Sequence, residues 1–346
     1  MIQRQCRWLV ASAIGVCASF GCMGISPVHA QSDTAIHEPR KYIASYPNDL
    51  TYKMMVNDYV DGFQVRTPTG TIALMPNVST ILKPSINFRF VTLSYSFAPK
   101  FFPGNNDDAT KGSTGGFSFG FGFNFRHWFQ TINAATTHGY YLTNTRDYNP
   151  LWKPGDPYVQ FPQLRITQLE GSIGYSTNSR FSMSAFASQT ERQTRSAGTF
   201  RPHLSYHIYR VEDQSGGVGT QASNNYEFMA NAGYHHTFVT RGRWYVSGGS
   251  TVGAGVVLTR LTTRTASGDI ITHSQSPAMR WELRAGLGYN GPILFAGASG
   301  FTAAAIFQQE NTTAVNSQHR SGFEVFAGFR MIAPEFVRNL FNRIKP

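Results

Sequence analysis

A strict two-residue alternation runs through residues 117–125 of this chain. Phenylalanine stands at each odd position, and serine, glycine, glycine and asparagine stand between. Successive side chains of a strand point to opposite faces of the sheet, so one face of this segment is aromatic and the other is small or polar. No helical period produces this pattern. The segment therefore predicts a β-strand that separates two different environments.

The same alternation recurs over residues 279–289, where bulky apolar residues alternate with Arg280, Glu282, Arg284 and two glycines. In a soluble β-sandwich, the apolar face would pack in a core and the charges would meet water. In a membrane barrel, the apolar face meets lipid and the charges line the interior. The alternation alone fits both architectures.

Aromatic content and low charge favour the membrane barrel. Aromatic residues make up 14% of the chain and gather near expected strand ends, as at Tyr140-Tyr141 and Trp244-Tyr245, which suits the aromatic girdles of barrels. Charged residues make up only 14%, less than soluble surfaces usually carry. We therefore predict an all-β fold, a transmembrane antiparallel β-barrel over residues 49–332. Its strand number should be even, about 12 with a range of about 10–14, because both termini of such barrels normally face the periplasm.

Connections and the C-terminal tail also follow from local patterns. Polar, glycine-rich stretches predict long loops at residues 103–116, 145–162, 212–225 and 262–277. Tight turns are expected at residues 177–179 and 289–291. A further strand is expected near residues 181–190. In the tail, residues 333–346, the spacing of Phe336, Leu340, Phe341 and Ile344 predicts a short amphipathic helix that rests on the inner leaflet or the barrel rim.

The first 30 residues have the organisation of a secretory signal peptide. Arg4 and Arg7 form a basic start, an apolar stretch follows, and Val28-His29-Ala30 offers a small-residue cleavage site. We predict export through the Sec pathway and cleavage near Ala30. Residues 31–48 then become a periplasmic N-terminal segment that precedes the barrel.

All three cysteines, Cys6, Cys17 and Cys22, lie in the predicted signal peptide, so the mature chain has no thiol and no disulfide. A lipoprotein acylated at Cys22 is the alternative. It is disfavoured because Ser19 stands where an acylation signal requires an apolar residue.

Export and a barrel fold together predict a location in the outer membrane of a Gram-negative cell. The net charge falls from +11 to +9 when Arg4 and Arg7 are removed, and such an excess can attract anionic headgroups. The expected partners are outer-membrane lipids, lipopolysaccharide and the barrel assembly machinery. No nucleic acid, cofactor or metal is expected, and any ligand stays unidentified.

Four segments of the chain resemble one bacterial outer-membrane family. They are Met75-Pro76-Asn77, Ser94-Tyr95-Ser96-Phe97, Gly139-Tyr140-Tyr141-Leu142 and the stretch from Phe181 through Ser188 to Phe200. The resemblance is to the family known as domain of unknown function 4421, and it covers most of residues 40–332. It implies a β-barrel, and it implies no activity and no catalytic residue. The approach to Pro76 departs from the Tyr-containing pattern of the family.

Within the last of these segments, Glu191, Arg192, Arg195 and Gly198 predict a charged hairpin tip with a glycine suited to a chain reversal. One interpretation is a solvated turn that only sets the strand register. The other is that the charged side chains reach the barrel interior or rim and hold a network or a ligand. The solvated turn is the favoured interpretation, because charged tips are usually only solvated.

A catalytic interpretation rests on His203-Leu204-Ser205 with Glu212 nearby. Alternation places His203 and Ser205 on one face of a strand, and a Ser nucleophile, a His base and an acid are the groups of an acyl hydrolase. So short a match occurs often by chance. The primary prediction is a non-enzymatic barrel with a structural or transport role, and a lipid-modifying acyl hydrolase is the alternative.

A set of charged residues is predicted to line the interior if the strand register holds. It consists of Glu170, Glu227, Arg280, Glu282, Arg284, Glu324 and Arg330. Mixed charges can pair to stabilise a closed, packed barrel, or they can line a selective polar passage. His235 and His236 are adjacent in a strand and point to opposite faces, so they do not predict a shared metal site.

Overall fold

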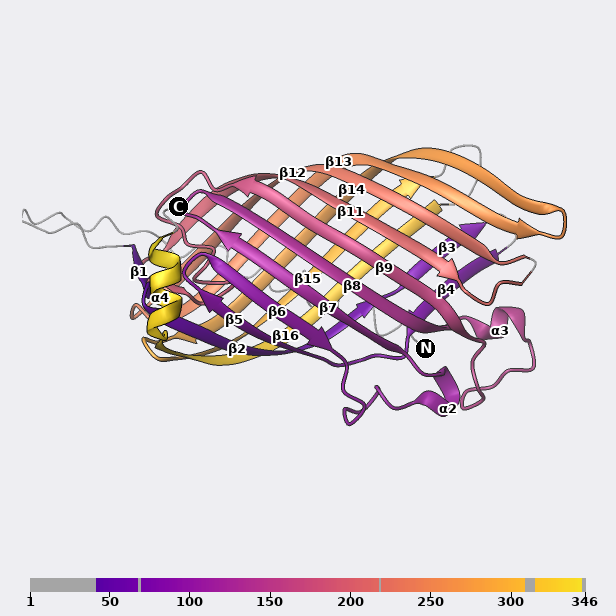
Figure 1. Ribbon diagram of the computed structural model, residues 1–346, viewed down its shortest axis with the longest axis horizontal. Helices are drawn as coiled ribbons and strands as arrows, with labels where there is room; N and C mark the ends of the chain where they lie inside the picture. Colours follow the sequence, from indigo (N-terminus) through magenta and orange to yellow (C-terminus); the bar gives the residue numbers. More distant parts are fainter. Residues whose placement is uncertain (1–41, 68–69, 218, 309–314, 344–346) are drawn as a thin grey trace, which may run out of the picture. The chain divides into compact units, whose positions relative to one another are not determined.

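The computed structural model describes residues 42–67, 70–217, 219–308 and 315–343, which form a closed antiparallel β-barrel (Figure 1). Twelve strands make the wall within these residues, so the predicted fold class and strand number are confirmed. The predicted signal peptide, residues 1–30, lies outside the described residues with its three cysteines, and so do residues 31–41 and Ile344.

The wall strands follow one another around the barrel in chain order, each antiparallel to its neighbours, and the barrel closes where the last pairs with the first. They are β2 (Asp49–Asp61), β5 (Ile81–Phe88), β6 (Val91–Phe97), β7 (Gly115–Asn124), β8 (Trp128–Leu142), β9 (Gln160–Tyr175), β11 (Ala197–Asp213), β12 (Gln221–Thr240), β13 (Trp244–Thr265), β14 (Gly268–Asn290), β15 (Leu294–Gln308) and β16 (Val315–Ile332).

The middle of the outer face of this wall carries many large apolar residues. Phe119 on β7 and Leu283 on β14 are 44% and 50% exposed, whereas the residues between such positions turn inward. An apolar exterior with alternating inward polar residues is the pattern of a membrane-spanning barrel. Within the described part of the chain, none of the helices has the length and apolar character needed to cross a bilayer.

The two ends of the barrel differ in their connections. Tight turns join β5 to β6 and β14 to β15 at the end where β2 begins and β16 finishes, which we call the terminal end. The predicted turn at residues 289–291 is found there. The opposite loop end carries two long connections, residues 98–114 with α2 (Asp108–Lys111) and residues 143–159 with α3 (Thr145–Tyr148), at the right of Figure 1.

Three predicted elements are wrong. Residues 262–277 are not a loop, because β13 and β14 continue as a long hairpin that turns at residues 266–267. Half of residues 212–225 is likewise strand, and the connection covers only the seven residues between Asp213 and Gln221. Threonine and isoleucine are frequent in the 262–277 hairpin, and such β-branched residues favour strand over loop. The expected strand near residues 181–190 is absent, and turns replace it.

The wall forks between β16 and β8. β3 (Phe63–Thr67) continues β2 in the same register against β16, and β4 (Gly70–Pro76) returns beside it to pair with β8. Towards the terminal end, β5, β6 and β7 fill the gap between β2 and β8. The chain leaves the wall between β4 and β5, at residues 77–80.

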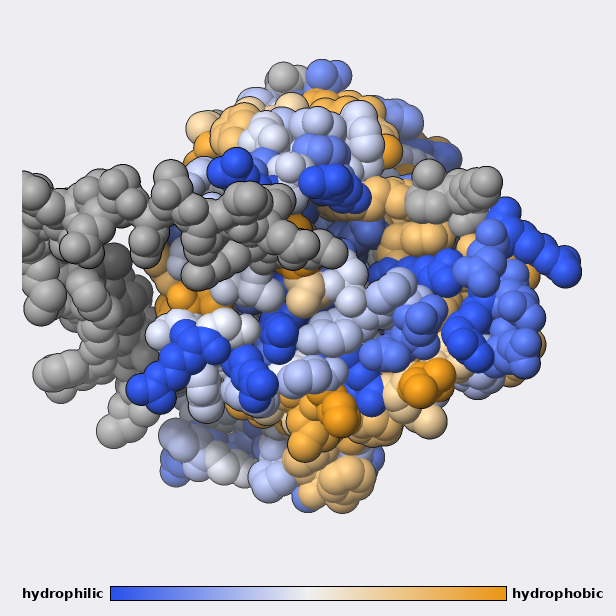
Figure 2. Space-filling model, turned by 90° about the vertical axis from the view of Figure 1, so that its left-hand side faces the viewer, coloured by the Kyte–Doolittle hydropathy of each residue, from blue (hydrophilic) through white to orange (hydrophobic). Residues whose placement is uncertain are grey.

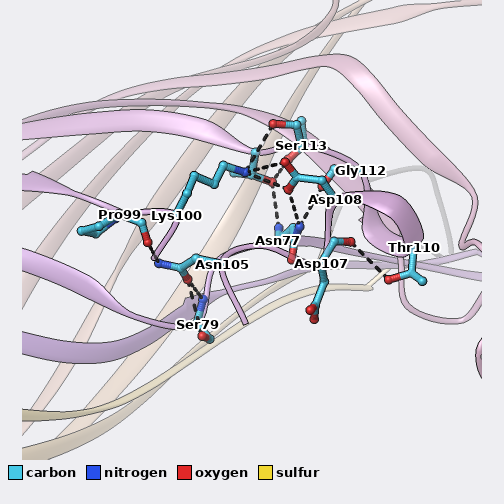
Figure 3. Close-up of polar contacts among 12 residues, drawn as sticks. Asn77, Ser79, Pro99, Lys100, Asn105, Asp107, Asp108, Thr110, Gly112 and Ser113 are labelled. Carbon is cyan, nitrogen blue, oxygen red and sulfur yellow. Dashed lines mark hydrogen bonds and ion pairs between the residues drawn. The ribbon is translucent and has the colours of Figure 1, made fainter. Parts of the chain in front are cut away.

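Buried asparagines bridge this fork (Figure 3). Asn77 donates from Nδ2 to the Asp108 carboxylate at 3.1 Å and to the Gly112 carbonyl at 2.9 Å. The Asn105 Oδ1 accepts the backbone N–H of Ser79 at 2.8 Å. Backbone groups that lose a ladder partner need another one when buried. The Met75-Pro76-Asn77 motif therefore has a structural explanation at the fork.

The predicted C-terminal helix is α4 (Glu335–Asn342). Val337 and Phe341 pack against a buried cluster that includes Leu50 and Phe88 at the terminal end, with the Phe341 and Phe88 ring centroids 4.9 Å apart. Leu340 on the same helix is 57% exposed. The helix is thus docked on the barrel and still presents apolar side chains outward.

Candidate functional site in the barrel interior

The seven charged residues predicted for the interior all occupy inward positions of their strands. On β14, Arg280, Glu282 and Arg284 alternate with exposed apolar residues such as Leu283 and Leu287. The same alternation holds on the other strands. The remaining inward residues are Glu170 on β9, Glu227 on β12, and Glu324 and Arg330 on β16.

Ion pairs join several of these groups. The Arg280 guanidinium lies 2.5 Å from the carboxylate of Glu227, which is 2% exposed. Arg284 lies 3.3 Å from Glu282 on the same strand. A buried charge is tolerated when it is paired and hydrogen-bonded. The interior of β12 and β14 therefore carries charge in mutually neutralising pairs.

The other two carboxylates accept hydrogen bonds from neutral side chains. Asn133 on β8 donates to Glu170 at 3.3 Å, and the Ser299 hydroxyl on β15 donates to Glu324. Each acidic group thus reaches across to a neighbouring strand. Together with the ion pairs, these contacts involve side chains of β8, β9, β12, β14, β15 and β16.

Three inward cations were not singled out from the sequence. Lys53 on β2 is 5% exposed, and Arg201 on β11 is 7% exposed, with its guanidinium 3.9 Å from the ring centroid of Phe129. Lys83 on β5 occupies the same face as Lys53. The alternation of Lys53 with Tyr52 and Met54 was the available signal, although β2 lacks the strong contrast of β7.

The chain between β9 and β11 folds into the terminal end of the barrel, and we call residues 176–196 the plug. Phe181, Phe186 and Gln189 in it are 3%, 9% and 0% exposed. The Lys53 ammonium donates to the Ala187 carbonyl at 3.0 Å, and the Phe186 ring packs edge-on against Tyr245. In Figure 2, which views this end, blue and white residues outnumber orange ones in the visible middle of the face.

Arg330 fastens the plug to the wall. Its Nε donates to the Gln189 carbonyl at 2.8 Å, and its Nη2 donates to the same oxygen and to the Asn290 side chain. Its Nη1 donates to the Gly291 carbonyl at 2.5 Å. The guanidinium also lies 4.1 Å from the Tyr46 ring centroid. One buried side chain therefore joins β16, the β14–β15 turn, the N-terminal segment and the plug.

The charged-tip interpretation of the hairpin motif needs correction. Glu191 lies in β10 (Glu191–Gln193), which pairs with β1 (Ile43–Ser45), and accepts hydrogen bonds from Ser182 at 2.5 Å and Ser45 at 3.1 Å. Arg192 shares this strand, and Arg195 lies 5.6 Å from the Tyr42 ring. Gly198 is within β11 and makes no chain reversal. The motif forms a packed network because the plug enters the barrel, which a local pattern does not reveal.

The proposed catalytic residues do not converge. His203 and Ser205 share the inner face of β11, but the Ser205 hydroxyl accepts from Asn231 at 2.9 Å, and His203 Nδ1 contacts the Arg201 carbonyl at 3.3 Å. Glu212 lies on the outer face, paired with Arg210 and Arg264, and about 23 Å of strand separates it from Ser205. Glu212 is therefore excluded as the acid of a triad.

One family model matches this chain over residues 31–331, and its description is "Domain of unknown function (DUF4421)". The chain belongs to the DUF4421 family. No curated protein matches it.

The DUF4421 chain is also similar to three solved structures at low identity. The outer membrane protease OmpT from Escherichia coli has 9% identity and a TM-score of 0.39, covering 84% of this chain and 98% of that one. Neisserial surface protein A has 9% identity and a TM-score of 0.22, with 79% and 96% covered. The Pseudomonas putida toluene transporter TodX has 7% identity and a TM-score of 0.29, with 82% and 90% covered. At these scores the similarity assigns no function.

Two further features lie towards opposite ends of the DUF4421 barrel. A cavity of about 870 Å³ lies beside the plug at the terminal end, lined by residues that include Ser184, Thr190, Glu191, Trp128 and Tyr175. An apolar cluster of Tyr140, Leu164 and Ile166 lies towards the loop end. Among the described residues, no group of three or more His, Cys, Asp or Glu side chains is placed to hold a metal ion.

Proposed function

We propose that this protein is an integral outer-membrane barrel that acts as a gated passage for small polar or charged solutes, closed at rest by the plug. In this proposal the terminal end faces the periplasm, as both termini of such barrels normally do. Export through the Sec pathway, cleavage near Ala30 and insertion by the barrel assembly machinery belong to the same proposal.

The observation that carries the proposal is the way in which the plug is attached. Arg330, Lys53 and Asn290 hold it chiefly through its backbone carbonyls. A hydrogen bond contributes only about 0.5–1.5 kcal/mol net, or about 1.5–3 kcal/mol when one group is charged, because water can replace the partner. Water can replace these polar attachments at moderate cost, and exposure of the buried Phe181 and Phe186 adds to the cost of release. The adjoining cavity offers space for such a movement.

The competing structural role explains the ion pairs but not the plug. Paired charges such as Arg280 and Glu227 can stabilise a closed barrel without any passage. A barrel that only needed to be filled would be more stable with apolar side chains than with a polar segment inside. The acyl-hydrolase alternative is disfavoured, because His203 and Ser205 face the interior, whereas acyl chains of membrane lipids lie outside the wall.

Planar-bilayer conductance of refolded protein tests the proposal. We expect rare openings for the native protein, and sustained conductance after residues 181–192 are replaced by a short Gly-Ser linker. Arg330→Gln should raise the open fraction by about tenfold for each 1.4 kcal/mol by which the attachment weakens. Arg243→Gln, at an exposed turn of the same end, is the control and should leave it unchanged.

Heat-modifiable gel mobility establishes that each variant is a folded barrel before conductance is compared. If the folded linker variant conducts no ions, the passage is ruled out and the structural role holds. Mass spectrometry of the mature N-terminus, combined with membrane fractionation, tests cleavage near Ala30 and the outer-membrane location.

A further inference from the structure

Arginines gather on the outer face of the wall where the apolar surface ends. Arg210 on β11, Asn224 on β12 and Arg260 on β13 are direct cross-strand neighbours, and all three are on the outward face of their strands. Tyr226 and Leu258, one outward step nearer to the terminal end, are 42% and 39% exposed. The change from apolar to cationic therefore occurs within one step along adjacent strands.

Acidic groups only partly balance this cluster. Glu212 pairs with Arg210 at 2.8 Å and with Arg264 at 3.0 Å, and it stands opposite Arg165 in the β9–β11 register. Asp269 stands opposite Arg264. Four arginines (Arg165, Arg210, Arg260 and Arg264) against two carboxylates leave an excess of two positive charges. The Arg210 side chain is still 53% exposed, so it remains accessible to a ligand.

A groove connects the cluster to the apolar surface. A cavity of about 540 Å³ runs over β9, β11 and β12 on the outer side of the barrel. Its lining includes Arg165, Arg210 and Gln214 near the loop end, and Leu169, Ile208 and Tyr226 nearer to the middle of the strands. The groove is thus polar and cationic at one end and apolar at the other.

We propose that this groove binds one phosphorylated lipid of the outer leaflet, with its phosphate at Arg165 and Arg210 and an acyl chain along Leu169, Ile208 and Tyr226. The guanidinium group forms paired hydrogen bonds to phosphate, which makes arginine better suited than lysine to this role. The apolar half of the groove removes acyl-chain surface from a polar environment. Glu212 holds Arg210 and Arg264 in position without neutralising the cluster.

The site rests on the proposed outer-membrane location but not on the gated passage. Outward arginines at the other end give a matched comparison within the same molecule. Arg241 and Arg243 lie in the β12–β13 turn at the terminal end and are exposed, and they line neither of the two cavities described above. Substituting these two arginines changes the net charge by the same amount as substituting two arginines of the groove, but it leaves the groove intact.

Native mass spectrometry of the folded barrel, with bis-phosphorylated lipid A as the probe, tests this site. We expect the native protein and the Arg241→Gln/Arg243→Gln variant to retain lipid A. The Arg165→Gln/Arg210→Gln variant should bind about tenfold more weakly for each guanidinium–phosphate pair that the substitutions remove. Dephosphorylated lipid A should bind the native protein as weakly as the phosphorylated lipid binds that variant.

Equal binding of phosphorylated and dephosphorylated lipid would overturn the site, and so would equal weakening in both double variants. Binding of inorganic phosphate as tightly as of the lipid would also contradict it, since the acyl half of the groove would then contribute nothing. Each of these results is read on protein with heat-modifiable mobility. A protein that is a folded barrel but binds no lipid contradicts only the lipid site, whereas a protein without heat-modifiable mobility contradicts the membrane barrel. Neither measurement uses conductance.

Discussion

The wall made by β6, β7 and β8 and the wall made by β12, β13 and β14 have similar outer faces and different inner faces. Leu93 and Phe119 in the first are 46% and 44% exposed, and Phe228 and Leu283 in the second are 48% and 50% exposed. Inside, the first is lined by uncharged residues, among them serine, threonine, glycine and asparagine, and we call it the neutral wall. The second carries Glu227 and the charges of β14, and we call it the charged wall.

This difference shows which constraint acts on which face. Contact with lipid imposes the same requirement on every strand, so both outer faces converge on large apolar residues. The residues of each inner face depend instead on the side chains that they contact inside the barrel. On the neutral wall, a Cβ at Gly120 would lie 2.5 Å from the Ser94 hydroxyl, so small residues allow close packing there. On the charged wall, Arg280 and Glu227 bridge from β14 to β12.

The largest effect should come from charging the outer face, and it should be equal on both walls. Phe119→Arg and Leu283→Arg each place a guanidinium in the hydrocarbon region, which destabilises barrels by about 2–4 kcal/mol near the bilayer midplane. Urea unfolding in phospholipid vesicles, followed by tryptophan fluorescence, measures this. Phe101→Arg, at a loop position that is 76% exposed, is the control and should have little effect. A large cost on one wall alone would show that the two outer faces do not share one environment.

A smaller effect is expected inside the charged wall. Glu227→Gln leaves Arg280 without its carboxylate, and breaking a buried pair costs about 3–5 kcal/mol. The Arg280 side chain is 22% exposed, so water offsets part of this and about 2 kcal/mol is expected. The double variant Glu227→Gln/Arg280→Gln should recover at least half of that stability in the same unfolding assay. Additive destabilisation would mean that the pair is not coupled.

The outer faces were predictable from the sequence because alternation is a local property. The Phe117–Phe125 pattern and the Met279–Tyr289 pattern each identify a lipid-facing side without knowledge of any partner strand. Inward charges such as Glu324 follow from the same parity. The helix α4 also follows from local spacing.

The plug and the fork were not predictable in this way. Gln189 is buried by Arg330, which is 141 residues away, and no local period encodes that contact. The resemblance of residues 181–200 to a family indicated importance but suggested a hairpin. At the fork, Asn77 and Asn105 supply hydrogen bonds where the chain leaves the wall between β4 and β5, and nothing in the local pattern distinguishes these asparagines from loop residues. Side-chain contacts between distant segments decide both features.

The smallest effect is expected on the neutral wall. Ser118 lies on the inner face of β7 between Ser96 of β6 and Ala135 of β8, so Ser118→Ala removes neither a charge nor a large side chain. The free energy of unfolding should change by less than about 0.5 kcal/mol.

Ion selectivity gives a second comparison of the two walls. In the barrel whose plug is replaced by the linker, Ser118→Ala should leave the reversal potential in a salt gradient unchanged, whereas Glu282→Gln on the charged wall should shift it towards anion preference. The reason is that fixed charges, and not neutral hydroxyls, select among permeant ions. An equal shift in both variants would show that solutes pass along the neutral wall as well, and that the two inner faces share one function.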